Sequence, residues 1–448
     1  MPIDKNVFLH ETDKTALKAL ESLPGFSSVV KAFMSGWNEK LMYIENMATN
    51  VRISDDQLKR YKDMLGPICT KLGIEEPELF LKLDVRPNAW TYGEKKPYIV
   101  ITSGLLETLP EELIPTVLAH ECGHIACHHV LYRTMGTMIL NGLFTAFPLT
   151  AVAVLPLKAA FAYWMRCSEY SADRAAILCD GTDEKLVQMC MRFAGFTRDV
   201  EGEMNLDAFM KQAEEYRELI QSDKVNKAME FMKYSFSDHP LNAVRAYEAR
   251  SWRNTEAFEK SQRYFEAYQR GEAPEEFPLD VDVHSLIGRD VKEAEESFRK
   301  KGFRNISLER DTARSLFGRN DTVTKITVGS NSDAQEGDWV NYDTPIVLRY
   351  YLPYSDEEAR AMHPGEIRMP YSSNFFTGKK KDDVCAYLEK MGFDYVTTEA
   401  VYDVPAEGNW SLGRVIRLEG DAPSFERGDW LKADTFFKVV YHERKELN

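Results

Sequence analysis

The chain has 448 residues, of which 44% are hydrophobic and 28% charged, so it is long enough for two or three domains that each bury a core. Its formal net charge of −15 argues against a nucleic-acid surface, because phosphate binding needs clustered lysine and arginine. We therefore expect a globular protein with no nucleic-acid partner.

The start of the chain has no basic residues followed by an apolar core, so we expect no secretory signal. The seven cysteines have no tight repeated spacing, and several lie in apolar runs. We interpret them as reduced core residues and predict a cytoplasmic location. Cys122 and Cys127 are expected to be packing residues, with a redox role as the minor alternative.

Amphipathic helices are predicted at Lys14–Leu23, at Ser27–Asn50 and from Ser54 through Lys71. Three short strands follow, at Leu79–Leu83, Ala89–Tyr92 and Tyr98–Thr102. An exposed edge strand of such a sheet can pair with the main chain of an extended peptide.

A helix with metal-ligand spacing comes next. Thr108–Glu111 fits a capping box before it, and Pro115 indicates a kink or a late start. The helix contains His120-Glu121-x-x-His124, and helical geometry places the two imidazoles one above the other, where both can bind one metal ion. Glu121 is rotated about 100° from His120, so its carboxylate can address a water without ligating the ion. The alternative is a solvated helix face that carries these residues by chance.

Residues 134–157 carry no charge and are long enough to cross a bilayer. One crossing would separate His124 from Glu169, and the 44 residues between them are too few for two crossings and a turn. We therefore predict a buried helical hairpin and no integral membrane span. Peripheral contact with a membrane through this segment is the alternative.

A second helical segment follows this stretch, and Glu169 and Asp173 share one face of it. Open zinc sites use three protein ligands, and two histidines with a glutamate are one known set, which Glu169 would complete. Asp173 is predicted to accept the other ring N–H of a ligand histidine. Otherwise the two are ordinary exposed helix carboxylates.

The C-terminal part contains an internal repeat. Gly288–Phe303 matches Gly378–Phe393, and Gly337-Asp338-Trp339 matches Gly428-Asp429-Trp430 at equal spacing. Each unit is predicted to have one helix closed by a glycine, followed by strands such as 346–350 and 436–441. The predicted domains are 1–270, with linker 271–278, then repeats 279–353 and 366–448 with linker 354–365.

Four stretches in order carry a family resemblance: Pro87–Gly93, Tyr98–Leu106, the His120 helix and Ser168–Asp173. Over about residues 30–250 the chain resembles the HtpX and CAAX-prenyl-endopeptidase family of gluzincin metallopeptidases, metallopeptidase family forty-eight. The resemblance implies one Zn²⁺ per chain bound by His120, His124 and Glu169. It also implies that Glu121 is the general base and that Asp173 orients His120.

The segment Ser237–Pro240, followed by Arg245, is similar to the family's His-Pro segment downstream of the site. The similarity implies that His239 faces the developing oxyanion, whereas a lone histidine before proline is more often a turn residue. We assign substrate binding to Asn88, Ala89, Trp90 and Arg245.

The repeats resemble PASTA domains, which place one helix on a three-stranded sheet. They are expected to bind an unknown ligand or protein, or to serve only in structural packing. The predicted fold class is α+β: a mainly helical zincin-type peptidase domain with a small β-sheet, followed by two small α/β PASTA-like repeats.

We predict a zinc-dependent metalloprotease, a metalloendopeptidase that hydrolyses peptide bonds of a peptide or protein substrate with a metal-activated water and Glu121 as general base. The alternative is a catalytically silent or partner-gated protein-binding module that uses the C-terminal repeats.

Overall fold

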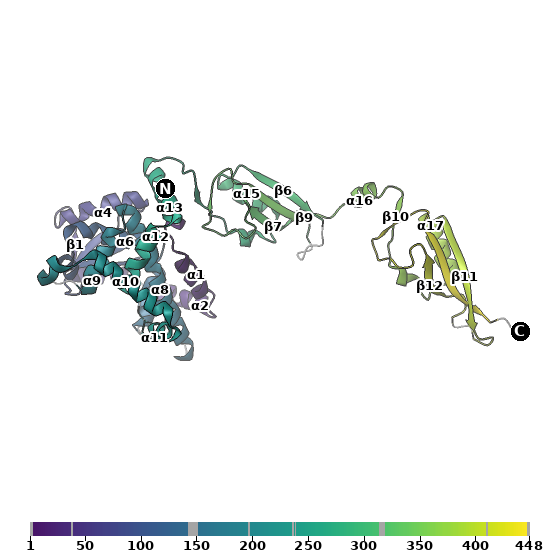
Figure 1. Ribbon diagram of the computed structural model, residues 1–448, viewed down its shortest axis with the longest axis horizontal. Coiled ribbons are helices and arrows are strands. Elements are labelled where there is room, and N and C mark those ends of the chain that lie inside the picture. Colours follow the sequence, from purple (N-terminus) through teal and green to yellow (C-terminus); the bar gives the residue numbers. More distant parts are fainter. Residues whose placement is uncertain are drawn as a thin grey trace. The chain divides into compact units, whose positions relative to one another are not determined.

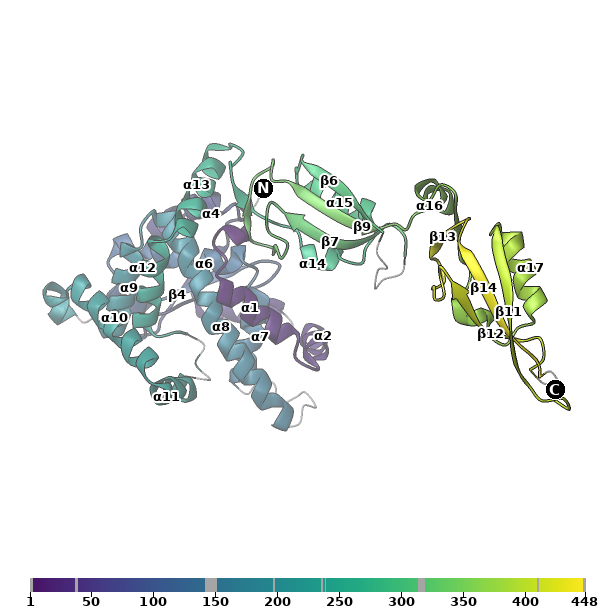
Figure 2. The ribbon, with the colours of Figure 1, turned by 45° about the vertical axis from the view of Figure 1, so that its right-hand side comes forward.

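The computed structural model describes residues 3–36, 39–141, 151–195, 198–234, 237, 239–312, 319–408 and 411–445. The chain divides into two compact units. The first comprises Met1–Ile287, Lys292–Ser307 and Ile326–Leu348, and the second comprises Gly288–Val291, Leu308–Lys325 and Arg349–Asn448. Figures 1 and 2 show the first unit as mainly helical and the C-terminal part as rich in strands.

The chain begins with helices. These are the 3₁₀ turn η1 (Lys5–Val7), α1 (Glu11–Glu21), α2 (Phe26–Gly36), α3 (Glu39–Thr49) and α4 (Lys59–Leu72). The single helix predicted over 27–50 contains α2 and α3, with residues 37–38 outside the described ranges. The start predicted at Ser54 is wrong: Ser54 N–H donates to Gln57 O in a turn, and Leu58 has a φ of 55°, which does not continue a helix.

The first unit contains a four-stranded sheet. Its strands are β1 (Val51–Ile53), β2 (Glu78–Lys82), β3 (Ala89–Tyr92) and β4 (Tyr98–Thr102), in the order β1-β2-β4-β3. The three predicted strands are confirmed within one residue, and β1 is an addition. Strand β3 pairs antiparallel with β4 and is an edge of this sheet.

The predicted capping box before the metal helix is wrong. Thr108 ends α5 (Ser103–Thr108), and the 3₁₀ turn η2 (Glu111–Leu113) lies between α5 and α6 (Ile114–Ala126). Helix α6 has no side-chain cap, and Pro115 lies in its first turn, where a missing N–H costs little. The late start indicated by Pro115 is therefore confirmed.

The predicted hairpin consists of α7 (Val130–Leu140) and α8 (Ala151–Asp180), which pack against each other. Residues 142–150, at its turn, lie outside the described residues. Met135, Ile139, Phe161 and Trp164 join residues of α1 and α2 in a buried core. Among the described helices, none is both long enough and apolar enough to cross a membrane.

The helices between residues 184 and 270 pack on α8 and on one another. They are α9 (Glu184–Gly195), the 3₁₀ turn η4 (Arg198–Glu203), α10 (Leu206–Ser222), α11 (Lys224–Tyr234), α12 (Asn242–Arg253) and α13 (Glu256–Arg270). The contacts of α12 with α8, α9 and α10 place Arg245 close to the helix that carries Glu169.

Both repeats contain a helix and a three-stranded sheet, as predicted. The first contains β5 (Phe277–Pro278), α14 (Val283–Leu286), α15 (Val291–Lys300), β6 (Ile306–Asp311), β7 (Thr322–Val328), β8 (Trp339–Val340) and β9 (Ile346–Tyr351). The second contains β10 (Glu366–Arg368), η5 (Ser373–Phe376), α17 (Lys381–Met391), β11 (Tyr395–Val404), β12 (Val415–Gly420), β13 (Trp430–Lys432) and β14 (Phe436–Arg444). Their sheets have the orders β6-β9-β7 and β11-β14-β12.

Equivalent hydrogen bonds confirm the internal repeat. Leu279 N–H donates to Asp338 O (2.7 Å), as Met369 N–H does to Asp429 O (2.8 Å).

The stretch predicted as linker 354–365 contains a helix, α16 (Asp356–Met362), because Ser355 and Glu358 form a capping box.

Candidate metal centre and catalytic cleft

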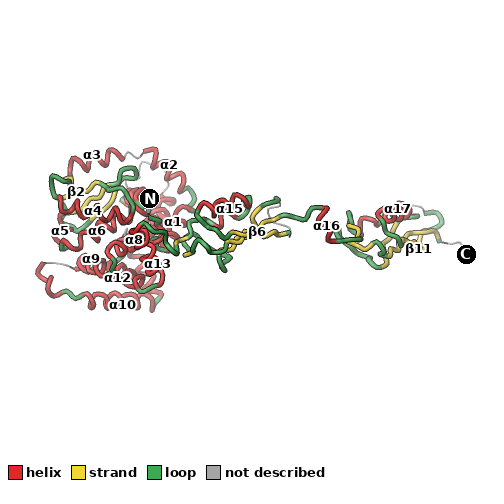
Figure 3. Tube along the Cα trace, turned by 90° about the horizontal axis from the view of Figure 1, so that it is seen from above, coloured by secondary structure: helices red, strands yellow, loops and turns green. Residues whose placement is uncertain are grey.

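The three predicted metal ligands meet where α6 crosses α8, which lie side by side in Figure 3. One ligand atom from each of His120, His124 and Glu169 lies within 4.8 Å of the others, and all three residues are buried. Glu169 Oε2 is 3.2 Å from His120 Nε2, and Oε1 is 3.3 Å from His124 Nε2. These three residues are called the ligand cluster below.

The close approach of the two helices depends on Gly123, between the ligand histidines. A Cβ at this position would lie 2.8 Å from the Cβ of Ala175 and 3.0 Å from the Cα of Ala172, both on α8. A backbone without a side chain is therefore needed here for the imidazoles of α6 to reach Glu169.

Gly123→Ala is expected to lower the free energy of unfolding by about 1–3 kcal/mol, because the added methyl group overpacks this helix contact. Urea denaturation of the full chain would measure the change. Gly195→Ala is the matched control, since a Cβ there meets nothing within 4 Å. Equal stability of the two variants would contradict the role given to Gly123.

Asp173 contacts His120 at the ring nitrogen that does not face Glu169. His120 Nδ1 lies 2.8 Å from Asp173 Oδ1, and Arg245 Nε donates to Asp173 Oδ2 at 2.9 Å. Arg245, which we expected at the substrate, is only 6% exposed and does not line the cleft described below. Arg245 instead supports the carboxylate of Asp173, which contacts His120.

The charges of the ligand cluster suit a cation. Burial alone would lower the pKa of His120, but hydrogen bonds with Asp173 and Glu169 raise it to about 9. Burial and the nearby Arg133 guanidinium hold the pKa of His124 well below its usual value. Burial alone would raise the pKa of Glu169, but Arg133 and His239 hold this pKa well below its usual value. An anionic carboxylate and a neutral imidazole are the forms that bind a metal, so Glu169 and His124 are ready to bind one, whereas His120 would release a proton to do so.

The atoms left without hydrogen bonds also fit a metal ion. Among the described residues, His124 Nε2 and Glu169 Oε1 are buried side-chain atoms with no hydrogen-bond partner. Arg133 Nη1 lies 2.6 Å from this Oε1 as an ion pair. Ligands about 2.0–2.2 Å from a tetrahedral zinc ion lie roughly 3.3–3.6 Å from one another, close to the distances of the Glu169 oxygens from the two imidazole nitrogens.

A cleft of about 430 Å³ opens beside the ligand cluster. Glu121, His124, Arg133 and His239 line it, together with the residues of β3. Thr91 Oγ1 donates a 2.7 Å hydrogen bond to Glu121 Oε2, and this fixes one carboxylate oxygen of the predicted general base.

The predicted substrate-binding residues of β3 lie along this cleft. Asn88, Ala89 and Trp90 all line it, and the edge position of β3 leaves one side of its backbone without a partner strand. His239 also lines the cleft: its side chain is 46% exposed, and its Nε2 lies 3.9 Å from Glu169 Oε1.

Two residues of this site were not found from the sequence. Thr91 reaches Glu121 only because β3 packs against α6. The His-Glu-x-x-His motif does not indicate which residue of β3 lies next to Glu121. Arg133 reaches Glu169 from α7 and also donates to Ser168 Oγ at 2.8 Å. A single basic residue in the otherwise apolar stretch after His129 was the one available signal.

Residues 56–253 match the family model described as peptidase family M48. The chain is 31% identical over 252 residues to the plastoglobule-localized metallopeptidase 48, chloroplastic, of Arabidopsis thaliana. The aligned region covers 56% of this chain and 73% of the Arabidopsis protein. It is 32% identical over 98 residues to a protease HtpX homologue of Methanopyrus kandleri, covering 20% of this chain and 31% of the homologue.

Two solved structures of parts of Ser/Thr kinases also match part of this chain. The extracellular region of the Ser/Thr kinase PrkC from Staphylococcus aureus matches with 16% identity and a TM-score of 0.18, over 38% of this chain and 49% of that one. The three-PASTA-domain structure of a Ser/Thr kinase from the same organism has 18% identity and a TM-score of 0.17, over 37% of this chain and 67% of that one.

Proposed function

Since the chain belongs to peptidase family M48, a family of metallopeptidases, we propose that it is a zinc-dependent metalloendopeptidase that cleaves peptide or protein substrates in the cleft beside β3. The observation that carries this proposal is the buried ligand cluster with an open cleft on one side. A structural zinc site is normally closed by a fourth protein ligand, whereas a catalytic one keeps a position for water.

His120, His124 and Glu169 would hold one Zn²⁺. When bound, zinc supplies Lewis acidity, which polarises the substrate carbonyl and lowers the pKa of water toward ~7. The hydrogen bond that His120 Nδ1–H donates to Asp173 fixes the tautomer of that ligand and raises its basicity.

Glu121 accepts the proton of the attacking water and delivers it to the leaving amine. Its position in the cleft and its hydrogen bond from Thr91 support this role, since they place and orient the carboxylate beside the ligand cluster. His239 lies across the cleft, where a donated hydrogen bond would stabilise the oxyanion of the tetrahedral intermediate.

The substrate would bind as an additional strand on the outer edge of β3. Main-chain hydrogen bonds from Asn88 to Thr91 would hold an extended peptide, and side-chain contacts with Trp90 would add apolar area. Main-chain pairing needs no terminal charge on the substrate, and this favours internal cleavage.

The test is a digest of a peptide library by the zinc-loaded full chain. We expect internal cleavage that stops when a chelator removes the metal and returns when zinc is added, with cut sites identified by mass spectrometry. A zinc-loaded chain that cleaves no peptide would count against the proposal.

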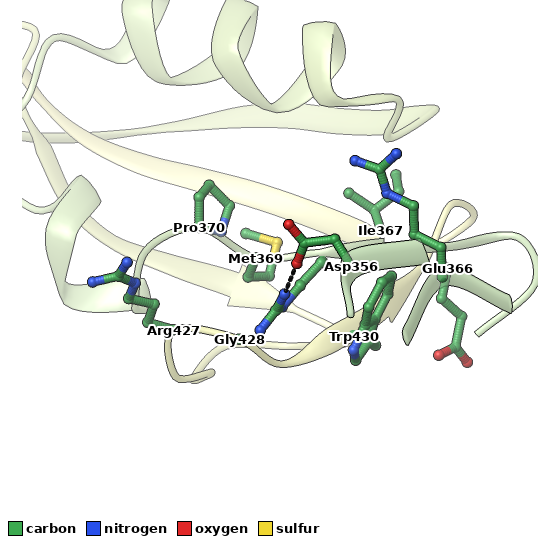
Figure 4. Close-up of a pocket in the computed structure, with 10 residues that line it drawn as sticks. Asp356, Glu366, Ile367, Met369, Pro370, Arg427, Gly428 and Trp430 are labelled. Carbon is green, nitrogen blue, oxygen red and sulfur yellow. Dashed lines mark hydrogen bonds and ion pairs between the residues drawn. The ribbon is translucent and has the colours of Figure 1, made fainter. Parts of the chain in front are cut away.

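A second candidate function is a partner-gated binding module that uses the repeats. A pocket of about 770 Å³ in the second repeat favours it, lined by Asp356, Arg368, Met369, Arg427 and Trp430 among others. Figure 4 shows Asp356 and Trp430 in this pocket, and Arg368 Nη1 donates to Asp356 Oδ1 at 2.9 Å. A chain that ends after Arg270 separates the two: higher activity without the repeats indicates gating, and no activity from either chain favours binding alone.

A further inference from the structure

A chain of buried polar side chains leads away from the ligand cluster at His124. His124 Nδ1 lies 3.1 Å from His129 Nδ1, and His129 Nε2 lies 3.0 Å from Asp13 Oδ2. The three residues are at most 2% exposed. No role in the site described above uses His129 or Asp13.

The local backbone explains why His129 faces His124. Helix α6 ends at Ala126, and His128 takes a left-handed conformation with a φ of 60°, which turns the chain back. His129 N–H then donates to His124 O at 3.0 Å. The side chain of His129 is thereby placed against the ring of His124, with the ring centroids 5.4 Å apart.

The partners of each ring nitrogen agree with one arrangement of protons. When Nε2 of His124 binds a metal ion it carries no proton, so Nδ1 carries the proton and its N–H points at His129 Nδ1. His129 Nδ1 then accepts this hydrogen bond, and His129 Nε2–H donates to Asp13. In this arrangement the two rings and the carboxylate satisfy one another, with no donor facing another donor.

Asp13 is itself fixed by the helix that carries Glu169. Ser171 Oγ donates to Asp13 Oδ2 at 2.6 Å, and Trp164 Nε1 donates to Asp13 Oδ1 at 2.9 Å. Both donors belong to α8, which packs along α1 (Figure 2). Asp13 precedes residues 56–253, the part of the chain that the family model matches.

We propose that His129 and Asp13 are positioning residues for the metal ligand His124, so that α1 is an integral part of the metal centre. The inference rests on the proposed function, because it assumes that a metal binds the ligand cluster. His120 is oriented by a carboxylate directly, whereas His124 is oriented by a carboxylate through a second imidazole. Removing such support typically lowers metal affinity by 10–100-fold.

The test is zinc competition with a chromophoric chelator on the purified full chain. His129→Phe removes both hydrogen bonds but keeps a ring, and Asp13→Asn keeps the shape of the carboxylate. We expect either variant to bind zinc about 10–100-fold more weakly than the wild-type chain. His128→Asn is the matched control, since His128 is exposed in the same turn and asparagine tolerates its left-handed backbone; its zinc affinity should not change.

A double-mutant cycle separates positioning from a general loss of stability. If His129 and Asp13 act as one unit, Asp13→Asn should weaken zinc binding by less than about 2-fold further in the His129→Phe background. Unfolding in excess chelator reports the stability of each variant without metal. Zinc affinities within 3-fold of the wild-type value in both single variants would overturn the inference, while a wild-type chain that binds no zinc would overturn the proposed function instead.

A measurement on the unmodified chain covers the case in which the variants do not fold. In the zinc-loaded protein, ¹⁵N–¹H spectra of the imidazoles should show His129 protonated at Nε2 and unprotonated at Nδ1. A proton on Nδ1 of His129 would contradict the arrangement, because that nitrogen could no longer accept from His124.

Discussion

Replacing Glu121 by glutamine is expected to lower peptide hydrolysis by about 10²–10⁴-fold while leaving zinc in place. Glutamine keeps the shape of the side chain and its hydrogen bond from Thr91, but its amide cannot accept the proton of the attacking water. Initial rates on a cleavable peptide and zinc content by elemental analysis measure the two effects separately.

The matched control for this variant is Glu112→Gln. Glu112 is an exposed carboxylate in the turn before α6, so its loss should leave the rate unchanged. Wild-type turnover by Glu121→Gln would show that another group is the general base. Loss of zinc together with activity would instead assign Glu121 to metal binding.

Glu169→Ala should weaken zinc binding by at least about 10-fold, since it removes the anionic member of the ligand cluster. The substitution also takes away the carboxylate beside Arg133, whose guanidinium then remains next to two imidazoles without that counter-charge. Zinc titration of the full chain measures the affinity, and activity at saturating zinc tests whether the remaining ligands suffice.

Glu184→Ala provides the comparison for this second substitution, because Glu184 is an exposed glutamate at the start of α9. It should keep wild-type zinc affinity. If Glu169→Ala retained full zinc content at low zinc concentration, Glu169 would not be a ligand, and the metal would have to be held by the histidines with another donor.

Several features of the fold could be predicted because they depend on short-range patterns. The strands 89–92 and 98–102 follow from runs of β-branched and aromatic residues between turns, and their observed bounds agree with the prediction. The repeats could be aligned because glycines and the Gly-Asp-Trp segment recur at equal spacing. Helix starts were less predictable: Ser54 and Thr108 have the residue types of N-caps, but Ser54 lies in a turn and Thr108 is the last residue of α5.

The sequence by itself determined the chemistry of the proposed site. Two histidines four residues apart on a helix share a face in any helical fold. A glutamate completes a known set of zinc ligands, and an aspartate four residues later can support a ligand histidine. Only the tertiary structure decided what surrounds that set. Thr91 on Glu121, Arg245 on Asp173, and His129 with Asp13 behind His124 each join segments that are distant in the chain. These contacts depend on how β3, α12 and α1 pack against α6 and α8, and a side chain's type and spacing carry no record of its partner across such a packing interface.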